Sequence, residues 1–323
     1  MNSYIDNLPT PFSVLAPMYE VTDTVFRQMV ADCARPDLFV TEFVNVDAMQ
    51  SPGRASAAWR FTYQPSEQPI LAQIWGSRPV NFEATARELV AMGYVGVDIN
   101  MGCPDKSVVK NVCGGGLIRE PEKATEIIRA TKAGLDGKVP LSVKTRIGFG
   151  SYDEAWIRTV LSWDLAMLSV HLRTVKEMSK VDAHYEYIAD IVRLCDEVSP
   201  KTKLVINGDI LTRQQGEALC REHGADGYMI GRGIFQNPFA FSVDNEWEDM
   251  SPGDKLRLYQ RHVELFAATW EAGSRPIAPL NKFCKTYLHG FDGAKEIRTE
   301  LMACKDLTEL RQKITHYLKT VAS

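Results

Sequence analysis

A short segment, residues 97–108, carries the residue types with the clearest capacity for chemistry. It reads VDINMGCPDKSV: an apolar run typical of a buried strand breaks at Gly102, and Cys103 then stands directly before Pro104. A cysteine thiol has an ordinary pKa of about 8.5, so at neutral pH it still has a proton to give up. The other interpretation is that Cys103 is a small apolar side chain buried at a turn, as free cysteines often are.

Polar residues that could hold or react with a ligand also follow the other short apolar runs of the chain. Structural turns alone would favour glycine, aspartate, asparagine and serine at these places, but glutamine, lysine, histidine and arginine also occur there. We therefore expect one site to which most of the runs contribute. The residues are Ala16–Pro17–Met18, Glu42 and Asn45, Gln73, Lys144 and Arg146, His171 and Arg173, Asn207–Gly208–Asp209, and Gly231–Arg232–Gly233.

The apolar runs are the elements that must position these residues. Each run is nearly continuous, as expected of a parallel strand covered on both faces, and helical spacing fills the stretches between them. Alternating units of this kind predict an α/β fold, a (β/α)8 barrel, whose active-site residues lie at the carboxyl ends of the strands. We expect strands at residues 12–16, 38–42, 70–74, 96–100, 141–145, 167–171, 203–207 and 227–230, with helices at 81–92, 121–133, 187–198 and 213–223.

The alternation of strands and helices ends after Pro238. From about residue 251 the pattern is amphipathic and helical, with breaks at residues 273–276 and 290–293. No Gly-x-Gly-x-x-Gly motif follows the first strand, and its absence argues against a doubly wound dinucleotide-binding fold. We therefore expect a catalytic barrel over residues 1–245 and a small helical bundle domain over residues 246–323.

Two glycine-containing turns point to an anionic ligand. The sequences NGDI (207–210) and IGRG (230–233) follow the seventh and eighth predicted strands. Their backbone N–H groups can approach a phosphate closely, and in (β/α)8 barrels this corner is the usual phosphate site. Lys144 and His171, on neighbouring strands, could supply further donors and positive charge.

Charge and cysteine usage limit the possible classes of protein. The seven cysteines are scattered without a Cys-x-x-Cys pair, so we expect neither a disulfide framework nor a metal site. The formal net charge is −4, yet residues 251–323 hold 12 Lys/Arg against 8 Asp/Glu, which leaves 25 against 33 for residues 1–250. This basic tail could contact a polyanion, or it could be an ordinary solvated helical face.

The composition also bears on location. Residues 1–11 lack the cationic segment and apolar run of a signal peptide, and no window has the roughly 18 consecutive apolar residues of a membrane span. We expect a cytoplasmic protein that does not enter the membrane.

Taken in order, these motifs resemble those of the tRNA-dihydrouridine synthases, in their FMN-dependent bacterial form. The resemblance covers residues 13–240, and the helical tail matches the C-terminal domain of that family. The segments DINMGCP and VKTRIG are its most specific parts. The motifs are LAPMYEVTD (15–23), TEFV (41–44), QIWG (73–76), DINMGCPDKSVVKN (98–111), SVKTRIG (142–148), HLRT (171–174), NGDI (207–210) and MIGRG (229–233).

The resemblance implies an oxidoreductase that reduces the C5–C6 bond of specific uridines in tRNA. Hydride would pass from reduced FMN to C6, with NADPH as reductant, and Cys103 would be the catalytic acid that protonates C5. Asn100 and Arg146 would bind the substrate. The expected cofactor residues are Ala16, Pro17 and Met18 beside the flavin, Gln73, Lys144 and His171 at its ring and ribityl chain, and Asn207, Gly208, Asp209, Gly231 and Arg232 at its phosphate.

The tail would then have a purpose, because a uridine in folded tRNA must leave its stack to reach a barrel mouth. We expect tRNA as partner and a monomeric enzyme.

Cys113 is the competitor of Cys103 for the acid role. The other enzyme class left open is a flavin barrel dehydrogenase acting on a free pyrimidine or dihydroorotate, and a non-enzymatic RNA-binding barrel is a third possibility. Basic candidates for phosphate contact in the tail are Arg275, Lys282, Lys285, Lys295, Arg298 and Lys313.

Two positions depart from the family pattern. Glu20 and Leu172 stand where the family usually has glycine, and the stretch after Leu172 lacks a further glycine that is common there. Leucine lacks the backbone freedom of glycine. These departures bear on which uridine is reduced and on how the phosphate is held.

Overall fold

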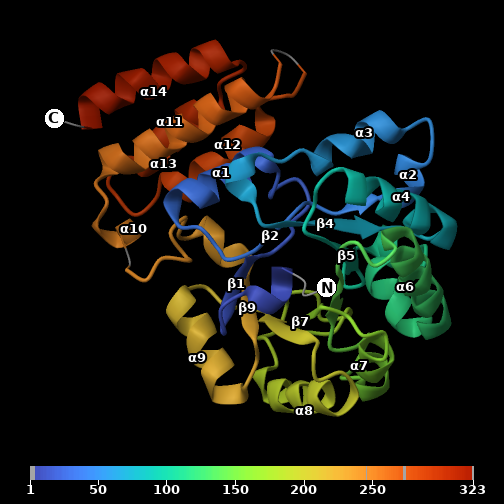
Figure 1. The fold of residues 1–323 in the computed structure, drawn as a ribbon. Coiled ribbons are helices and arrows are strands. Elements are labelled where there is room, and N and C mark those ends of the chain that lie inside the picture. Colours follow the sequence, from blue (N-terminus) through green and yellow to red (C-terminus); the bar gives the residue numbers. More distant parts are fainter. Residues whose placement is uncertain (1–3, 245, 272–273, 322–323) are drawn as a thin grey trace.

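The computed structural model describes residues 4–244, 246–271 and 274–321, and its centre is a barrel of parallel strands (Figure 1). The neighbour order along the sheet is β1-β9-β8-β7-β6-β5-β4-β2, and β3 also pairs with β4. A bridge between Val14 and Leu38 joins the two outer strands, which closes the sheet and confirms the predicted (β/α)8 class. The strands are β1 (Phe12–Leu15), β2 (Phe39–Val40), β3 (Val44–Asn45), β4 (Ile70–Trp75), β5 (Gly96–Asn100), β6 (Leu141–Arg146), β7 (Met167–His171), β8 (Lys203–Asn207) and β9 (Gly227–Ile230).

Helices surround the barrel and bury their apolar faces against it. The predicted helix over residues 213–223 has the same bounds in the structure, and the other predicted helices differ by a few residues at their ends. The longer helices are α1 (Thr24–Cys33), α4 (Pro79–Ala91), α6 (Pro121–Leu135), α7 (Glu154–Leu161), α8 (Ile188–Val198) and α9 (Arg213–His223). Shorter turns are α2 (Val46–Met49), α3 (Arg54–Ala58), α5 (Lys106–Lys110), η1 (Tyr4–Asn7), η2 (Trp59–Phe61), η3 (Pro65–Glu67), η4 (Gly114–Arg119), η5 (Tyr185–Tyr187) and η6 (Arg232–Phe235).

The second strand differs from the prediction, because it is split into β2 and β3. The Thr41 hydroxyl accepts a hydrogen bond from the backbone N–H of Gln73 at 3.0 Å and donates one to the carbonyl of Glu42 at 2.9 Å. A side chain therefore takes the place of a backbone partner in the ladder, and regular pairing is interrupted at residues 41–43.

The tail is helical, as expected, and packs on the barrel. Its elements are α10 (Glu246–Asp249), α11 (Pro252–Thr269), α12 (Ala278–Tyr287), α13 (Ala294–Met302) and α14 (Leu307–Val321). Figure 1 shows α11 and α12 against α1, and the ring of Phe26 on α1 stacks on that of Phe283 on α12 at 4.7 Å. Apolar residues of barrel and tail form one continuous core. Among the described helices none is long and apolar enough to cross a membrane.

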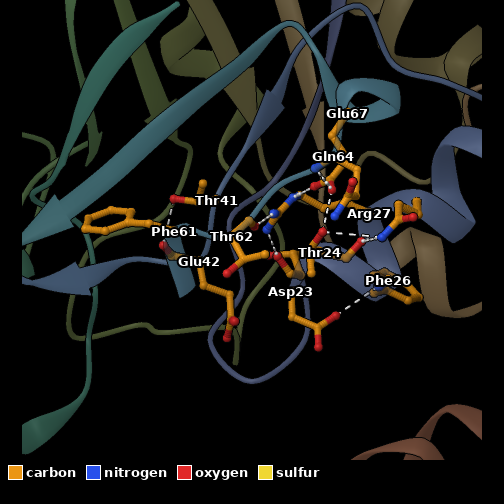
Figure 2. A network of polar contacts seen from close by, with 12 residues as sticks. Asp23, Thr24, Phe26, Arg27, Thr41, Glu42, Phe61, Thr62, Gln64 and Glu67 are labelled. Carbon is orange, nitrogen blue, oxygen red and sulfur yellow. Dashed lines mark hydrogen bonds and ion pairs between the residues drawn. The ribbon is translucent and has the colours of Figure 1, made fainter. Parts of the chain in front are cut away.

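A buried ion pair fixes the loops next to β1 and β4 (Figure 2). Arg27 contacts Glu67 at 2.5 Å, and its other nitrogens donate to the carbonyls of Thr22 and Thr62 at 2.6 and 2.8 Å. Both charged side chains are fully buried, so removing either would leave an unpaired charge inside the protein. The loop after β1 is therefore held rigidly at the mouth of the barrel.

Candidate active site

A cavity of about 560 Å³ opens at the carboxyl ends of the strands, within the size range of small-molecule sites. Most of the predicted site residues line it, whereas Gln73, Asn100 and Cys103 do not. The lining residues are Ala16, Pro17, Met18, Pro104, Lys144, Arg146, His171, Arg173, Met178, Ser179, Asn207, Gly208, Asp209, Ile210, Leu211, Gly231, Arg232, Gly233 and Gln236.

The strand period explains why these side chains meet. Side chains two residues apart on a strand share a face, so His171 points the same way as Ser169 and Met167. Register adds to this effect, because Asn100 is paired with Lys144, Arg146 with His171, and His171 with Asn207. Apolar residues such as Met167 fill part of the barrel interior, and buried polar residues such as Asp98 and Ser142 fill the rest.

The cavity is strongly positive. His171 lies within the electrostatic reach of Lys144, Arg146, Arg173 and Arg232, and burial together with these four cations holds the pKa of His171 well below its usual value. The imidazole is therefore neutral at pH 7, and its Nδ1 is buried with no hydrogen-bond partner among the described residues. A buried polar atom without a partner inside a cationic cavity is what an anionic ligand with hydrogen-bonding groups would satisfy.

Lys144 crosses the interior of the barrel toward β8. Its Nζ donates to the side-chain oxygen of Asn207 at 3.3 Å, and Asn207 is itself held by the carbonyl of Met229 at 2.8 Å. Burial, and then the neighbouring Arg146, lower the pKa of Lys144 to about 8. The ammonium form still dominates at pH 7, so Lys144 presents one positive charge to the cavity.

Arg173, two residues after the end of β7, was expected near the site from the strand pattern but had no role in the family resemblance. Its side chain is 2% exposed and lines the cavity, and its Nη1 has no partner among the described residues. The carboxylate of Asp209 pairs with both Arg173 and Arg232. Asp209 thus orients two guanidinium groups, which are the more direct candidates for contact with a phosphate.

Gln73 and Asn100 belong to a hydrogen-bonded chain just beneath the cavity. Asp98 accepts from Ser142 and from Gln73, each at 2.6 Å, and Gln73 in turn accepts from the amide of Asn100 at 3.0 Å. The Asn100 oxygen accepts from the backbone N–H groups of Gly102 and Cys103 at 3.1 and 3.0 Å. Asn100 therefore holds the turn that carries Cys103.

Asp98 was not among the predicted site residues. A carboxylate inside the apolar run VDIN was the signal that could have identified it, since buried charged residues are rare unless they are paired. Burial raises the pKa of Asp98 to about 6, against the hydrogen bonds from Ser142 and Gln73 that lower it.

Cys103 is partly exposed and lies at the edge of the cavity, next to the lining residue Pro104. Arg146 holds this turn from the other side: its Nε donates to the carbonyl of Gly102 at 2.7 Å, and its Nη1 donates to the carbonyls of Thr174 and Met178. Burial raises the pKa of Cys103, so its thiol keeps its proton at neutral pH. The geometry suits a proton donor better than a nucleophilic thiolate.

Cys113, the competitor for the acid role, is less accessible. It is buried, and its thiol contacts the carbonyl of Asn111 at 3.4 Å. Burial raises the pKa of Cys113 to about 11. Neither cysteine is among the lining residues, but Cys103 is the more exposed of the two and directly precedes the lining residue Pro104, which favours Cys103 for the acid role.

The backbone conformation differs among the positions where this chain lacks a glycine that the family usually has. Glu20 has φ 57° and Met178 has φ 56°, both in the left-handed region where glycine is favoured. Leu172 has no positive φ and is fully buried in the core. Met178, on the loop after β7, lines the cavity, and no sequence motif marked it.

Comparisons with known proteins point to one family. The family described as "Dihydrouridine synthase (Dus)" matches residues 14–322. A protein of Bacillus subtilis (strain 168) described as "Probable tRNA-dihydrouridine synthase 2" is 48% identical over 307 residues, which cover 94% of this chain and 93% of that protein. A "Probable tRNA-dihydrouridine synthase" of Staphylococcus aureus (strain COL) is 46% identical over 318 residues, covering 98% and 95%.

Among solved structures, the old yellow enzyme homologue from Zymomonas mobilis is similar with a TM-score of 0.51 and 14% identity, over 73% of this chain and 90% of that one. This likeness supports the barrel fold alone. The sequence match spans both the barrel and the helical tail, and it contains every predicted site residue. The chain belongs to the dihydrouridine synthase family.

Proposed function

We propose that the chain is a tRNA-dihydrouridine synthase that uses FMN and NADPH to reduce the C5–C6 bond of uridines in tRNA. The observation that carries this proposal is a cationic cavity at the barrel mouth with a protonated cysteine at its edge, in a chain of this family. The relatives described as tRNA-dihydrouridine synthases share nearly the whole length of the chain, which supports tRNA as the substrate.

The cavity fits FMN in size and charge. The buried Nδ1 of His171 and the Nη1 of Arg173 both lack partners among the described residues, so hydrogen-bonding groups of a ligand would satisfy them. Arg173 and Arg232 would hold the phosphate, together with backbone N–H groups near Gly231. A side chain at Gly208 would clash, because its Cβ would lie 2.9 Å from that of Ala183 and its φ is 131°. Lys144 would stabilise negative charge on the ring system.

In the proposed reaction, C6 of the uracil would receive a hydride from the reduced form of the bound flavin. The residues of this chain then provide the proton and the orientation. Cys103 would donate its Sγ proton to C5, and Asn100 and Arg146 would keep the cysteine turn in place from two sides. The Asn100 amide carries a second hydrogen that it can donate to a uracil carbonyl, in line with its predicted substrate-binding role.

The helical tail, residues 246–323, would bind the body of the tRNA. Lys282 and Lys285 on α12 and Lys295 on α13 are exposed, and within the described residues no ion pair involves them. The other three basic candidates are engaged within the protein. Arg275 lies against the rings of Trp59 and Trp270, Arg298 donates to the carbonyl of Leu288, and Lys313 lies near Glu300 and Glu309. The three lysines are therefore the better candidates for phosphate contact. We further propose that the enzyme acts in the cytoplasm as a monomer.

The test uses the purified full-length protein. A flavin absorbance spectrum reports the cofactor, and dihydrouridine is then quantified in unmodified tRNA and in free uracil or dihydroorotate reactions, with NADPH or NADH. We expect a yellow protein that forms dihydrouridine only in tRNA. Activity confined to free pyrimidines would contradict the proposal, and so would a colourless protein that binds tRNA without modifying it.

A further inference from the structure

Arginine and aromatic side chains alternate in a row that runs from the barrel mouth to the tail. Arg60 lies 4.6 Å from the ring centre of Tyr19 and 4.3 Å from that of Trp59. Arg275 lies over Trp59 at 3.1 Å and over Trp270 at 4.6 Å. We call these five residues the junction row. It combines residues from the β1–α1 loop, from the turn after α3 and from the tail, so it spans the boundary between the two parts of the chain.

Tyr19 is the end of the junction row that is nearest to the cavity. It directly follows Met18, which lines the cavity, and 48% of its surface is exposed. Its ring is backed by that of Phe43 at 5.4 Å, and its hydroxyl accepts a hydrogen bond from Arg60 at 2.9 Å. An exposed aromatic ring held in place from two directions has little conformational freedom left to lose when a ligand stacks on it.

The backbone that carries Tyr19 is also fixed. The N–H of Met18 donates to the Thr22 hydroxyl at 2.9 Å, and the N–H of Glu20 donates to the carboxylate of Glu42 at 2.5 Å. Figure 2 shows Glu42 and Asp23 beside the buried Arg27 network that anchors this loop. Tyr19 thus stands on a rigid turn.

One cation of the junction row, Arg60, keeps a donor that makes no hydrogen bond to the described residues. Arg60 is 12% exposed and lies 3.9 Å from Glu42, and its Nε has no hydrogen-bond partner among the described residues. The Nε1 of Trp270 is likewise buried and has none. A row of aromatic rings and guanidinium planes matches the chemistry of unstacked nucleobases linked by phosphates.

We propose that Tyr19, braced by Arg60 and Phe43, is the stacking site for an unpaired nucleobase next to the uridine that enters the cavity. The proposal rests on the proposed function, because a uridine that leaves its stack exposes its neighbours to solvent. Stacking one of them on Tyr19 would compensate for the broken stack, and the rest of the junction row would guide the strand toward the tail. The ligand class is single-stranded RNA within a folded tRNA.

The experiment compares Tyr19→Leu with Tyr19→Phe and Tyr19→Trp in the FMN-loaded enzyme. Leucine keeps apolar bulk but removes the flat ring, whereas phenylalanine and tryptophan keep it. We expect Tyr19→Leu to lower kcat/KM for dihydrouridine formation in tRNA by about tenfold or more, mainly through KM, while Tyr19→Phe and Tyr19→Trp stay within about threefold of the wild type. Flavin content and NADPH-dependent flavin reduction, which need no RNA, should be unchanged in all three.

Tyr4→Leu is the matched control, because Tyr4 is 45% exposed and lines a different cavity, away from the barrel mouth. Equal activity of Tyr19→Leu and the wild type on tRNA would overturn the proposal. An equal loss in the leucine, phenylalanine and tryptophan variants would also overturn it, since the ring would then not be what matters. A wild-type protein that forms no dihydrouridine would instead refute the proposed function itself.

Discussion

Replacing Asn100 with alanine should disturb the turn that carries Cys103. The Asn100 side chain makes three hydrogen bonds: it donates to Gln73 and accepts from the N–H groups of Gly102 and Cys103. The alanine variant leaves those three groups without this partner, two of them in buried residues and the third in the partly exposed Cys103. A net loss of about 1 kcal/mol per hydrogen bond gives a decrease of about 2–4 kcal/mol in the free energy of unfolding.

The effect on catalysis should exceed the effect on stability. If the Cys103 turn shifts by as little as about 1 Å, the rate of dihydrouridine formation can fall by about 100-fold. Asn100→Asp separates the two roles of this residue. Aspartate keeps an acceptor for both N–H groups of the turn, and Lys144 on the paired strand position offers a compensating charge. It loses the amide that donates to Gln73 and that could donate to the uracil.

The assay is the single-turnover rate of dihydrouridine formation in saturating tRNA, together with urea unfolding of each variant. We expect Asn100→Ala to lose both stability and rate, and Asn100→Asp to keep most of the stability while KM for tRNA rises. An alanine variant with wild-type stability would refute the reasoning that the amide anchors the turn. If Asn100→Asp were as unstable as Asn100→Ala, the accepting oxygen would not be the important atom.

Three further predictions concern other parts of the chain. Reversing the charge at Lys282 and Lys285 together should weaken tRNA binding and reduce its salt dependence, as measured by filter binding or fluorescence titration. The FMN content should be unchanged. Unaltered tRNA binding would exclude α12 as a phosphate contact. Arg173→Gln should raise the FMN dissociation constant by about tenfold or more in fluorescence titration, because it removes a buried cation, whereas equal affinity would place the phosphate elsewhere. Burial raises the pKa of Asp98 from its ordinary value of about 3.8 to about 6, so the unfolded chain loses this proton first and the free energy of unfolding should fall by about 3 kcal/mol as pH rises from about 4 to 6. Asp98→Asn should remove this slope from urea unfolding measured across that range; an unchanged slope would show that Asp98 is not its source.

The barrel could be predicted from the sequence because parallel strands covered on both faces leave a simple pattern. Runs such as residues 203–207 and 227–230 are nearly continuous in apolar residues, and their bounds agree with β8 and β9. The split of the second strand could not be predicted, because it depends on the Thr41 side chain replacing a backbone partner. This hydrogen bond depends on where β4 lies next to Thr41, and the strand preferences of the residues do not indicate it.

The candidate site was predictable to the extent that it follows strand ends. Lys144, His171 and Asn207 meet at the cavity because the register of the strands brings them to one level. The hydrogen-bonded chain through Asp98 was not predictable, since a single sequence does not say which polar side chains inside a barrel pair with each other. The cavity contribution of Met178 was hidden for a related reason, because loop residues carry no periodic pattern.

The most direct test is the rate at which FMN-loaded Cys103→Ala forms dihydrouridine in unmodified tRNA, with Cys113→Ala measured beside it. We predict that Cys103→Ala retains FMN and its reduction by NADPH but loses most of the dihydrouridine formation, because the proton for C5 is then missing from the edge of the cavity. Cys113→Ala should keep wild-type activity. A fully active Cys103→Ala variant would contradict the assignment of Cys103 as the catalytic acid.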